Sequence, residues 1–168
     1  GYDTIENINS SQTGTFSNIA DLDATLKLSN TALGGTFTYT TAAVAGSSDA
    51  ATLVVSDVTA GTVTIAGIET LNISSVGSAN AFGALTVANA TTLDISGDQS
   101  LDLGTLSTSV TTIDGSDMSG ALTADGTNTT GNAITGGSGD DTIEGDAGAD
   151  TLTGGAGDDA ITIAAGAD

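Results

Sequence analysis

A short sequence motif of alternating apolar and polar residues recurs along the middle of the chain with little change. The phrase is IETLNIS from Ile68, TTLDIS from Thr91 and TTID from Thr111, so its copies stand roughly twenty residues apart. Strict alternation of this kind is typical of a half-buried β-strand. No segment keeps apolar residues at the i, i+3, i+4, i+7 spacing of an amphipathic helix, and the pattern therefore predicts an all-β fold.

Further short runs of alternating residues lie before and between these phrases, separated by turn signals such as Gly97-Asp98 and Asp125-Gly126. The additional strands that we expect are residues 25–28, 36–40, 52–56, 62–66, 84–87, 100–103 and 121–124, with a loop at residues 42–50. Two or three short strands in each coil of about twenty residues are typical of a β-solenoid. The sequence therefore predicts a right-handed parallel β-helix.

A stricter repeat begins at Gly136. Written in nines, the chain continues GGSGDDTIE, GDAGADTLT, GGAGDDAIT and IAAGAD. The fourth place is always glycine, the sixth is always aspartate, and the eighth is isoleucine or leucine in the three complete copies. The sixth-place aspartates are Asp141, Asp150, Asp159 and Asp168. A fixed internal period marks a stacked architecture in which no single unit buries its own apolar face.

The residue types of this repeat suggest what its turns do. Glycine allows positive φ and sharp turns, which aim several backbone carbonyl oxygens inward, and the aspartate adds a carboxylate to that group of oxygens. The last three places form a short strand with one side chain pointing inward. We expect two nonapeptides to form one flattened coil, so that Asp141 stacks with Asp159 and Asp150 stacks with Asp168.

Stacked carboxylates need a positive partner, because two of them about 5 Å apart repel by roughly 3 kcal/mol at an effective dielectric constant near 20. The chain has 21 acidic residues, a single lysine or arginine, no histidine and no cysteine. A hard cation with oxygen ligands fits this need, and a flexible cage of carboxylates and carbonyls favours Ca²⁺ over Mg²⁺. The alternative is a flexible acidic tail, against which the three coincident period-nine positions argue.

These nonapeptides resemble the RTX repeat, GGxGxDxUx, of proteins exported by type I secretion systems. The resemblance implies a parallel β-roll with Ca²⁺ in its turns. The candidate metal-binding residues are Gly137, Gly139, Asp141, Asp146, Gly148, Asp150, Gly155, Gly157, Asp159 and Asp168. The fourth copy is partial, with Ile163 and Ala164 in place of two glycines. Residues 127–135 form a degenerate copy that keeps Asn132 and Ile134 in the sixth and eighth places.

The middle of the chain is similar to the Thr/Ser/Ala/Gly-rich sequence of RTX-bearing bacterial surface-layer proteins and large surface adhesins, on the phrases quoted above. We expect three parts: an irregular β-rich start at 1–66, solenoid coils of about twenty residues at 67–126, and an RTX roll at 127–168. Since the chain starts and stops inside patterned sequence, we also expect it to be a fragment of a longer protein, with any secretion signal outside it.

Charge and composition exclude several classes of function. The formal net charge of −20 argues against nucleic acid and against anionic membrane surfaces as partners. No apolar run approaches the ~20 residues of a membrane span, so we expect no membrane insertion. Triads built on histidine and thiol chemistry are excluded within the chain, which has neither residue type.

Some acidic pairs leave alternatives open. Asp140/Asp141 and Asp158/Asp159 have the residue types of a glycosidase acid and base, although a calcium turn with one solvated neighbour explains them better. The pairs Asp94/Asp98, Asp114/Asp117 and Asp125/Asn128 are either further Ca²⁺ sites or solvated turn residues.

The resemblance implies a structural, non-enzymatic subunit of a secreted bacterial surface layer. We expect the chain to stay unfolded in low cytosolic Ca²⁺, to fold outside the cell, and to self-associate into a lattice on the cell surface. Another part of the chain would hold any lipopolysaccharide or glycan. The alternatives are the stalk of an RTX adhesin and the calcium-roll appendage of a secreted protease or lipase whose missing part would carry HExxH or GxSxG.

Overall fold

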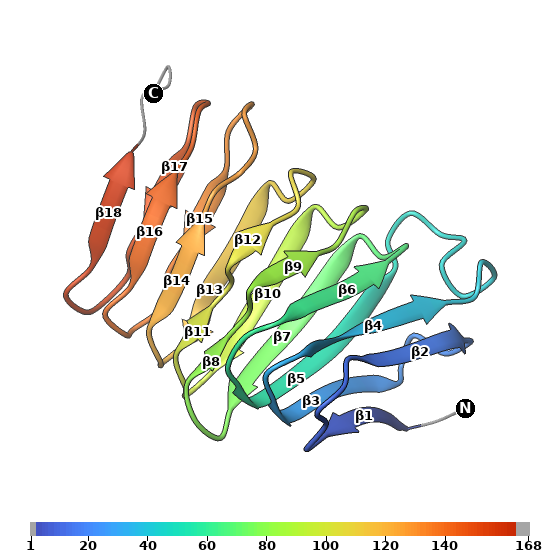
Figure 1. Ribbon diagram of the computed structural model, residues 1–168. Helices are drawn as coiled ribbons and strands as arrows, with labels where there is room; N and C mark the ends of the chain where they lie inside the picture. Colours follow the sequence, from blue (N-terminus) through green and yellow to red (C-terminus); the bar gives the residue numbers. More distant parts are fainter. Residues whose placement is uncertain (1–2, 164–168) are drawn as a thin grey trace.

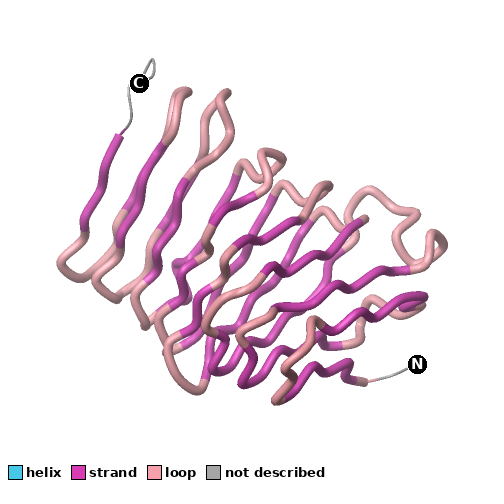
Figure 2. The backbone as a smooth tube through the Cα atoms, in the orientation of Figure 1, coloured by secondary structure: helices cyan, strands magenta, loops and turns pink. Residues whose placement is uncertain are grey.

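The computed structural model describes residues 3–163, and in it the chain winds into parallel β-strands stacked along one axis (Figure 1). Figure 2 shows strands joined by loops and turns, with no helix among the described residues. The strands form three parallel sheets, of which the largest has eight strands and therefore marks eight coils. The predicted all-β parallel solenoid is confirmed.

Each sheet takes one strand from each of several successive coils. The long sheet consists of β1 (Thr4–Ile8), β3 (Thr25–Thr31), β5 (Ala50–Val58), β7 (Thr70–Val76), β10 (Thr92–Gly97), β13 (Thr112–Met118), β15 (Ala133–Thr135) and β17 (Thr151–Thr153). The first short sheet consists of β2 (Gly14–Ile19), β4 (Gly34–Tyr39), β6 (Thr62–Ala66), β9 (Ala84–Thr86) and β12 (Thr105–Leu106). The second short sheet consists of β8 (Asn80–Ala81), β11 (Leu101–Asp102), β14 (Leu122–Asp125), β16 (Thr142–Gly145) and β18 (Ala160–Ile163).

The cross-section of the solenoid changes along its axis. The first coils contain the long sheet and the first short sheet, the middle coils contain all three sheets, and the last coils contain the long sheet and the second short sheet. Coil length falls from 22 residues where Thr70 pairs with Thr92 to 18 residues where Ala133 pairs with Thr151. Two nonapeptides therefore form one coil, as the repeat predicts.

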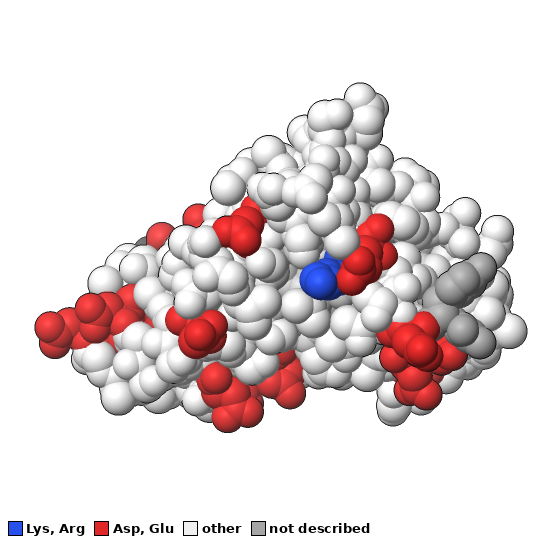
Figure 3. All heavy atoms as spheres, turned by 90° about the horizontal axis from the view of Figure 1, so that it is seen from below, with Lys and Arg blue, Asp and Glu red and all other residues white. Residues whose placement is uncertain are grey.

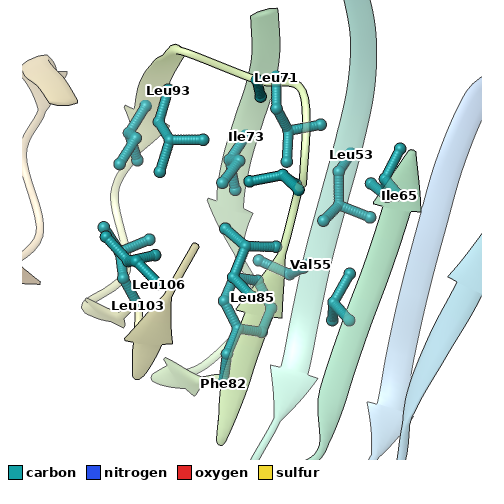
Figure 4. Close-up of a cluster of buried hydrophobic side chains, with 14 of the residues drawn as sticks. Leu53, Val55, Ile65, Leu71, Ile73, Phe82, Leu85, Leu93, Leu103 and Leu106 are labelled. Atoms are coloured by element: carbon teal, nitrogen blue, oxygen red, sulfur yellow. The ribbon is translucent and has the colours of Figure 1, made fainter. Parts of the chain in front are cut away.

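The interior is filled by the apolar half of each alternating strand. Leu71 pairs with Leu93, Leu93 pairs with Ile113, and all three side chains are buried. Figure 4 shows leucines, isoleucines and valines from facing strands pointing into this interior. Full burial of such a side chain contributes about 2 kcal/mol. Beyond residue 126, Ile134 and Ile143 are the buried apolar side chains among the described residues.

The loop expected at residues 42–50 is confirmed except at its last residue, where β5 begins.

The structure also contains strands that the alternation did not predict. Strands β2, β8 and β12 were not expected, and two of them have only two residues. In β2, the ring of Phe16 stacks on that of Phe37 with centroids 5.2 Å apart. The sequence Gly-Thr-Phe occurs in both strands and is the signal for this pairing.

Candidate calcium-binding turns

Two columns of turns connect the sheets in the last coils. The outgoing turns, residues 136–141 and 154–159, lead from the long sheet to the second short sheet. The return turns, residues 126–132 and 146–150, lead back to the long sheet. The outgoing turns contain the candidates Gly137, Gly139, Asp141, Gly155, Gly157 and Asp159, and the second return turn contains Asp146, Gly148 and Asp150. Asp168 lies outside the described residues.

Asp141 is the most buried candidate carboxylate, with 1% of its surface exposed. Its Oδ1 accepts a hydrogen bond from the Leu122 N–H at 2.7 Å, and its Oδ2 accepts one from the Gly137 N–H at 2.7 Å. Hydrogen bonds from backbone N–H groups to an ionised carboxylate are charge-assisted and among the stronger ones in proteins. The coil below and the outgoing turn itself therefore hold Asp141 in place.

The same bond recurs at the other described sixth-place aspartates. Asp159 Oδ1 accepts the N–H of Asp141 at 2.9 Å, and Asp150 Oδ1 accepts the N–H of Asn132 at 2.7 Å. In both cases the donor is the sixth-place amide of the coil below. The predicted stacking of Asp141 with Asp159 is thereby confirmed, and Asn132 takes the place of an aspartate in the degenerate copy.

The glycines of the outgoing turns are required by close contact between coils. A Cβ on Gly155 would overlap the carbonyl oxygen of Gly137, and a Cβ on Gly157 would overlap that of Gly139. Gly155 and Gly157 also have φ values of +110° and +116°, which favour glycine. At these two positions the turns thus pack backbone against backbone.

The donor set fits Ca²⁺. The outgoing turns contain the carboxylates of Asp141 and Asp159 and the backbone carbonyl groups of Gly137 and Gly139, and all of these potential ligand atoms are oxygens. Hard cations such as Ca²⁺ take six to eight oxygen ligands of this kind. Within residues 3–163, no three acidic side chains converge into one cluster. Bound Ca²⁺ would supply positive charge beside the stacked carboxylates, with backbone carbonyls completing the set of ligands.

A second aspartate of the first outgoing turn has a role that sequence reasoning missed. Oδ1 of Asp140, in the fifth place, accepts the N–H of Asp158, the fifth-place residue of the next coil, at 2.8 Å. The fifth-place carboxylate thus bonds to the coil above, whereas the sixth-place carboxylate bonds to the coil below. The doubled aspartates of the first and third nonapeptides were the available signal.

Negative charge near these turns is not offset by basic side chains. Asp125 faces Glu144 in register, and burial, together with the charges of Glu144 and Asp146, raises the pKa of the Asp125 carboxyl. Lys27, the chain's single basic residue, pairs with Glu6 at 3.3 Å in the first coils. On the face drawn in Figure 3, the one blue patch lies against red, and the other acidic side chains visible there form separate patches.

Two of the other pairs considered from sequence contain a residue with a local hydrogen-bond partner. Asp114 Oδ1 accepts the Ser116 N–H at 3.0 Å, and hydrogen bonding to Ser116 lowers the pKa of that carboxyl. Asn128 donates from Nδ2 to the Thr108 carbonyl at 2.9 Å. Asp94 lies in register with Asp114 on the neighbouring strand. Both side chains are on the exposed face of the long sheet.

Comparison with known families agrees with this geometry. Residues 128–168 match the family model described as the RTX calcium-binding nonapeptide repeat, in four copies. This segment of the chain therefore carries RTX repeats, and Ca²⁺ is the cofactor that such motifs bind. A comparison with curated proteins finds no match. Over residues 3–163 the structure has no helix with the length and apolarity needed to cross a membrane.

Proposed function

We propose that the chain is a calcium-dependent structural part of a secreted bacterial surface-layer protein. In this function the ordered solenoid associates with other copies into a lattice on the cell surface. The observation that carries the proposal is the stack of Asp141 and Asp159 in turns that match a calcium-binding repeat. Secretion is supported by the repeat itself, because RTX proteins are typically exported by type I secretion.

Calcium binding would act as a switch between the unfolded and ordered states of the nonapeptide coils. Calcium at about a hundred times its dissociation constant adds about 2.7 kcal/mol per site to the stability of the ordered state. The nonapeptide coils have little else to hold them together, because Ile134 and Ile143 are their buried apolar side chains within the described range. Ordering of these coils would therefore follow the calcium concentration.

Association between copies is also linked to charge. Each chain has a formal net charge of −20, so copies repel one another until cations reduce that charge. The edges of parallel sheets present unpaired N–H and C=O groups, which are templates for pairing with another chain. Calcium would thus favour both the ordered roll and the approach of a second subunit.

A titration with free Ca²⁺, followed by circular dichroism and light scattering, tests this function. Mg²⁺ at the same concentrations is the matched control, since it demands stricter octahedral geometry and retains its waters. A gain of β-structure accompanied by large assemblies supports a lattice subunit. Ordering to a stable monomer would instead favour the stalk of an adhesin or the appendage of an enzyme. No spectral change with calcium would contradict the proposed function altogether.

A further inference from the structure

The coils before the nonapeptide segment have an apolar core of their own. Fully buried leucines, isoleucines and valines line the interior from β3 to β14, and examples are Leu53, Leu71, Leu93 and Leu122, each with no exposed surface. The coils from residue 127 to residue 163 replace most of this core with glycine turns and carboxylates. The two parts therefore differ in what stabilises them: apolar burial in the first and, through the RTX repeats, calcium in the second.

The two parts meet within a single column of inward-pointing side chains. Asn80 pairs with Leu101, and Leu101 pairs with Leu122, along the second short sheet. The next strand continues this register, with Thr123 opposite Thr142, so Asp141 follows Leu122 in the column. The same position is thus leucine in the last apolar coils and aspartate in the nonapeptide coils. We call the contact between Leu122 and Asp141 the seam.

Hydrogen bonds from backbone N–H groups join the two coils at the seam and beside it. The Leu122 N–H donates to Asp141 Oδ1 at 2.7 Å, and the Ser138 N–H donates to the Met118 carbonyl at 2.9 Å. A Cβ on Gly137 would overlap that Met118 carbonyl, so this outgoing turn lies directly on the turn of the last apolar coil. The amide and carbonyl groups that place the first nonapeptide coil belong to a coil that does not carry the repeat.

We propose that the coils up to residue 126 fold without Ca²⁺ and that their last coil is the template on which the nonapeptide coils order when Ca²⁺ is present. This inference rests on the proposed function for the calcium dependence of residues 127–163. The sequence suggested that the whole chain is unfolded in low calcium. According to this inference, only residues 127–163 are unfolded under that condition. Order starts at the seam and extends toward β18.

Templating has a clear physical advantage. The first coil of a solenoid is costly because it fixes many backbone dihedrals before any neighbouring coil offers hydrogen bonds. A preformed coil supplies donors and acceptors at the correct spacing, so only the entropy of each added coil remains to be offset by its contacts and bound calcium. Since stacked repeats contact only their neighbours, a defect at the seam weakens the nonapeptide coils more than an equal defect several coils away.

Amide hydrogen exchange of the 168-residue chain at graded free Ca²⁺ tests the inference. In chelator, we expect protected amides in β5 to β13 and rapid exchange in β15 to β18. Added calcium should then protect β15 to β18, with β16 protected at lower calcium than β18. The seam variant is Leu122→Ala, which removes a buried side chain and no candidate ligand, and Leu122→Val serves if the former fails to fold.

The matched control is Leu53→Ala, the same change at an equally buried leucine in β5. We expect Leu122→Ala to raise the calcium midpoint for β16 about tenfold, and Leu53→Ala to leave it unchanged. Equal shifts in the two variants would overturn templating at the seam, as would a chain that is unprotected throughout in chelator. Neither outcome would contradict the proposed function, because the nonapeptide coils could still order with calcium. If calcium protected no amides in any variant, the proposed function would fail as well.

Discussion

The backbone N–H of Asp141 donates a hydrogen bond to Oδ1 of Asp159, one coil above it, at 2.9 Å. The same relationship joins Asn132 to Asp150, although Asn132 belongs to a degenerate copy of the repeat. The backbone of each coil therefore positions the carboxylate of the next. In Asp141 both carboxylate oxygens are held in this way, Oδ1 by the Leu122 N–H and Oδ2 by the Gly137 N–H, so protein contacts fix the orientation of a carboxylate that Ca²⁺ would bind.

Replacing Asp159 with asparagine should separate its charge from its hydrogen bond. Asparagine keeps an oxygen acceptor for the Asp141 N–H but removes one of the stacked charges. We expect Asp159→Asn to raise the calcium midpoint of ordering about tenfold, the factor that corresponds to 1.4 kcal/mol. Because repulsion between the carboxylates is relieved, the same variant should exchange its β16 amides more slowly in chelator.

Asp94→Asn is the matched control, because Asp94 is an exposed aspartate on the long sheet, away from the nonapeptide turns. Calorimetric calcium titration and hydrogen exchange measure the two effects. If Asp94→Asn shifted the midpoint as much as Asp159→Asn, the effect would come from net charge, and the outgoing turns would not be the binding site.

Gly155→Ala should prevent the last nonapeptide coil from stacking. The new Cβ would overlap the Gly137 carbonyl oxygen, and φ is +110° at this position. We expect a loss of at least about 2 kcal/mol in the ordered state, seen as a higher calcium midpoint for β18 by hydrogen exchange. Gly83→Ala is the control, because there the nearest atoms lie 3.3 Å from the new Cβ and φ is not positive. A similar midpoint for both variants would contradict the close contact between turns.

Much of this architecture follows from local pattern. Alternation in the phrases around Leu71, Leu93 and Ile113 places these residues on one face, and their near-constant spacing places them in one column of a solenoid. The period of nine places Asp141 and Asp159 in equivalent turns, because a fixed repeat that stacks must superpose equivalent residues. The first inference needs only the period, which is visible in a single sequence, whereas the second also needs each coil to contain two nonapeptides.

Features that depend on contacts between coils were harder to predict. Strands of two residues, such as β8 and β12, are too short to show alternation. The bond between the two outgoing turns from the Asp158 N–H to Asp140 uses a place where the repeat allows any residue. The seam could not be predicted either, because equivalence between Leu122 and Asp141 appears only once coils of different lengths are stacked.

Asn80 should be essential to the corner of the coil at which the second short sheet begins, at β8. It is buried, its Oδ1 accepts the Val58 N–H at 2.9 Å, and its Nδ2 donates to Ser75 Oγ at 2.9 Å and to the Ser78 carbonyl at 2.9 Å. Asn80→Ala leaves these groups without partners, and we expect it to lower the free energy of unfolding by about 3 kcal/mol. Urea unfolding followed by circular dichroism measures the loss.

Asn80→Leu distinguishes hydrogen bonding from packing at this corner. Leucine matches Leu101, the register partner of residue 80, but offers no acceptor to the Val58 N–H. We therefore expect no rescue. The exposed Asn89 accepts the Gly67 N–H at 3.3 Å, so Asn89→Ala is a control that should cost less than about 1 kcal/mol. Recovery of stability by leucine would show that volume, rather than hydrogen bonding, matters at position 80.

Tyr39 should make the solenoid sensitive to alkaline pH. The side chain is 6% exposed, and its hydroxyl makes no hydrogen bond within the described part of the chain. Burial, with a smaller contribution from the charge of Asp21, raises the pKa of Tyr39 from 10.0 to about 12. Between these values the unfolded chain has lost the phenolic proton while the folded chain retains it. The folded state should therefore lose up to about 2 kcal/mol of stability as pH rises from about 10 to about 12.

Tyr39→Phe removes both the titrating group and a buried hydroxyl without a partner. We expect it to raise the free energy of unfolding at neutral pH by about 1 kcal/mol and to abolish the Tyr39 contribution to alkaline destabilisation. Asp21→Asn serves as the control: it keeps the hydroxyl but removes the nearby negative charge, so destabilisation should be smaller than in the unmodified chain. Urea unfolding across this pH range, with calcium held constant, measures all three chains. If Tyr39→Phe lost stability between pH 10 and 12 as steeply as the unmodified chain, Tyr39 would not be the group responsible.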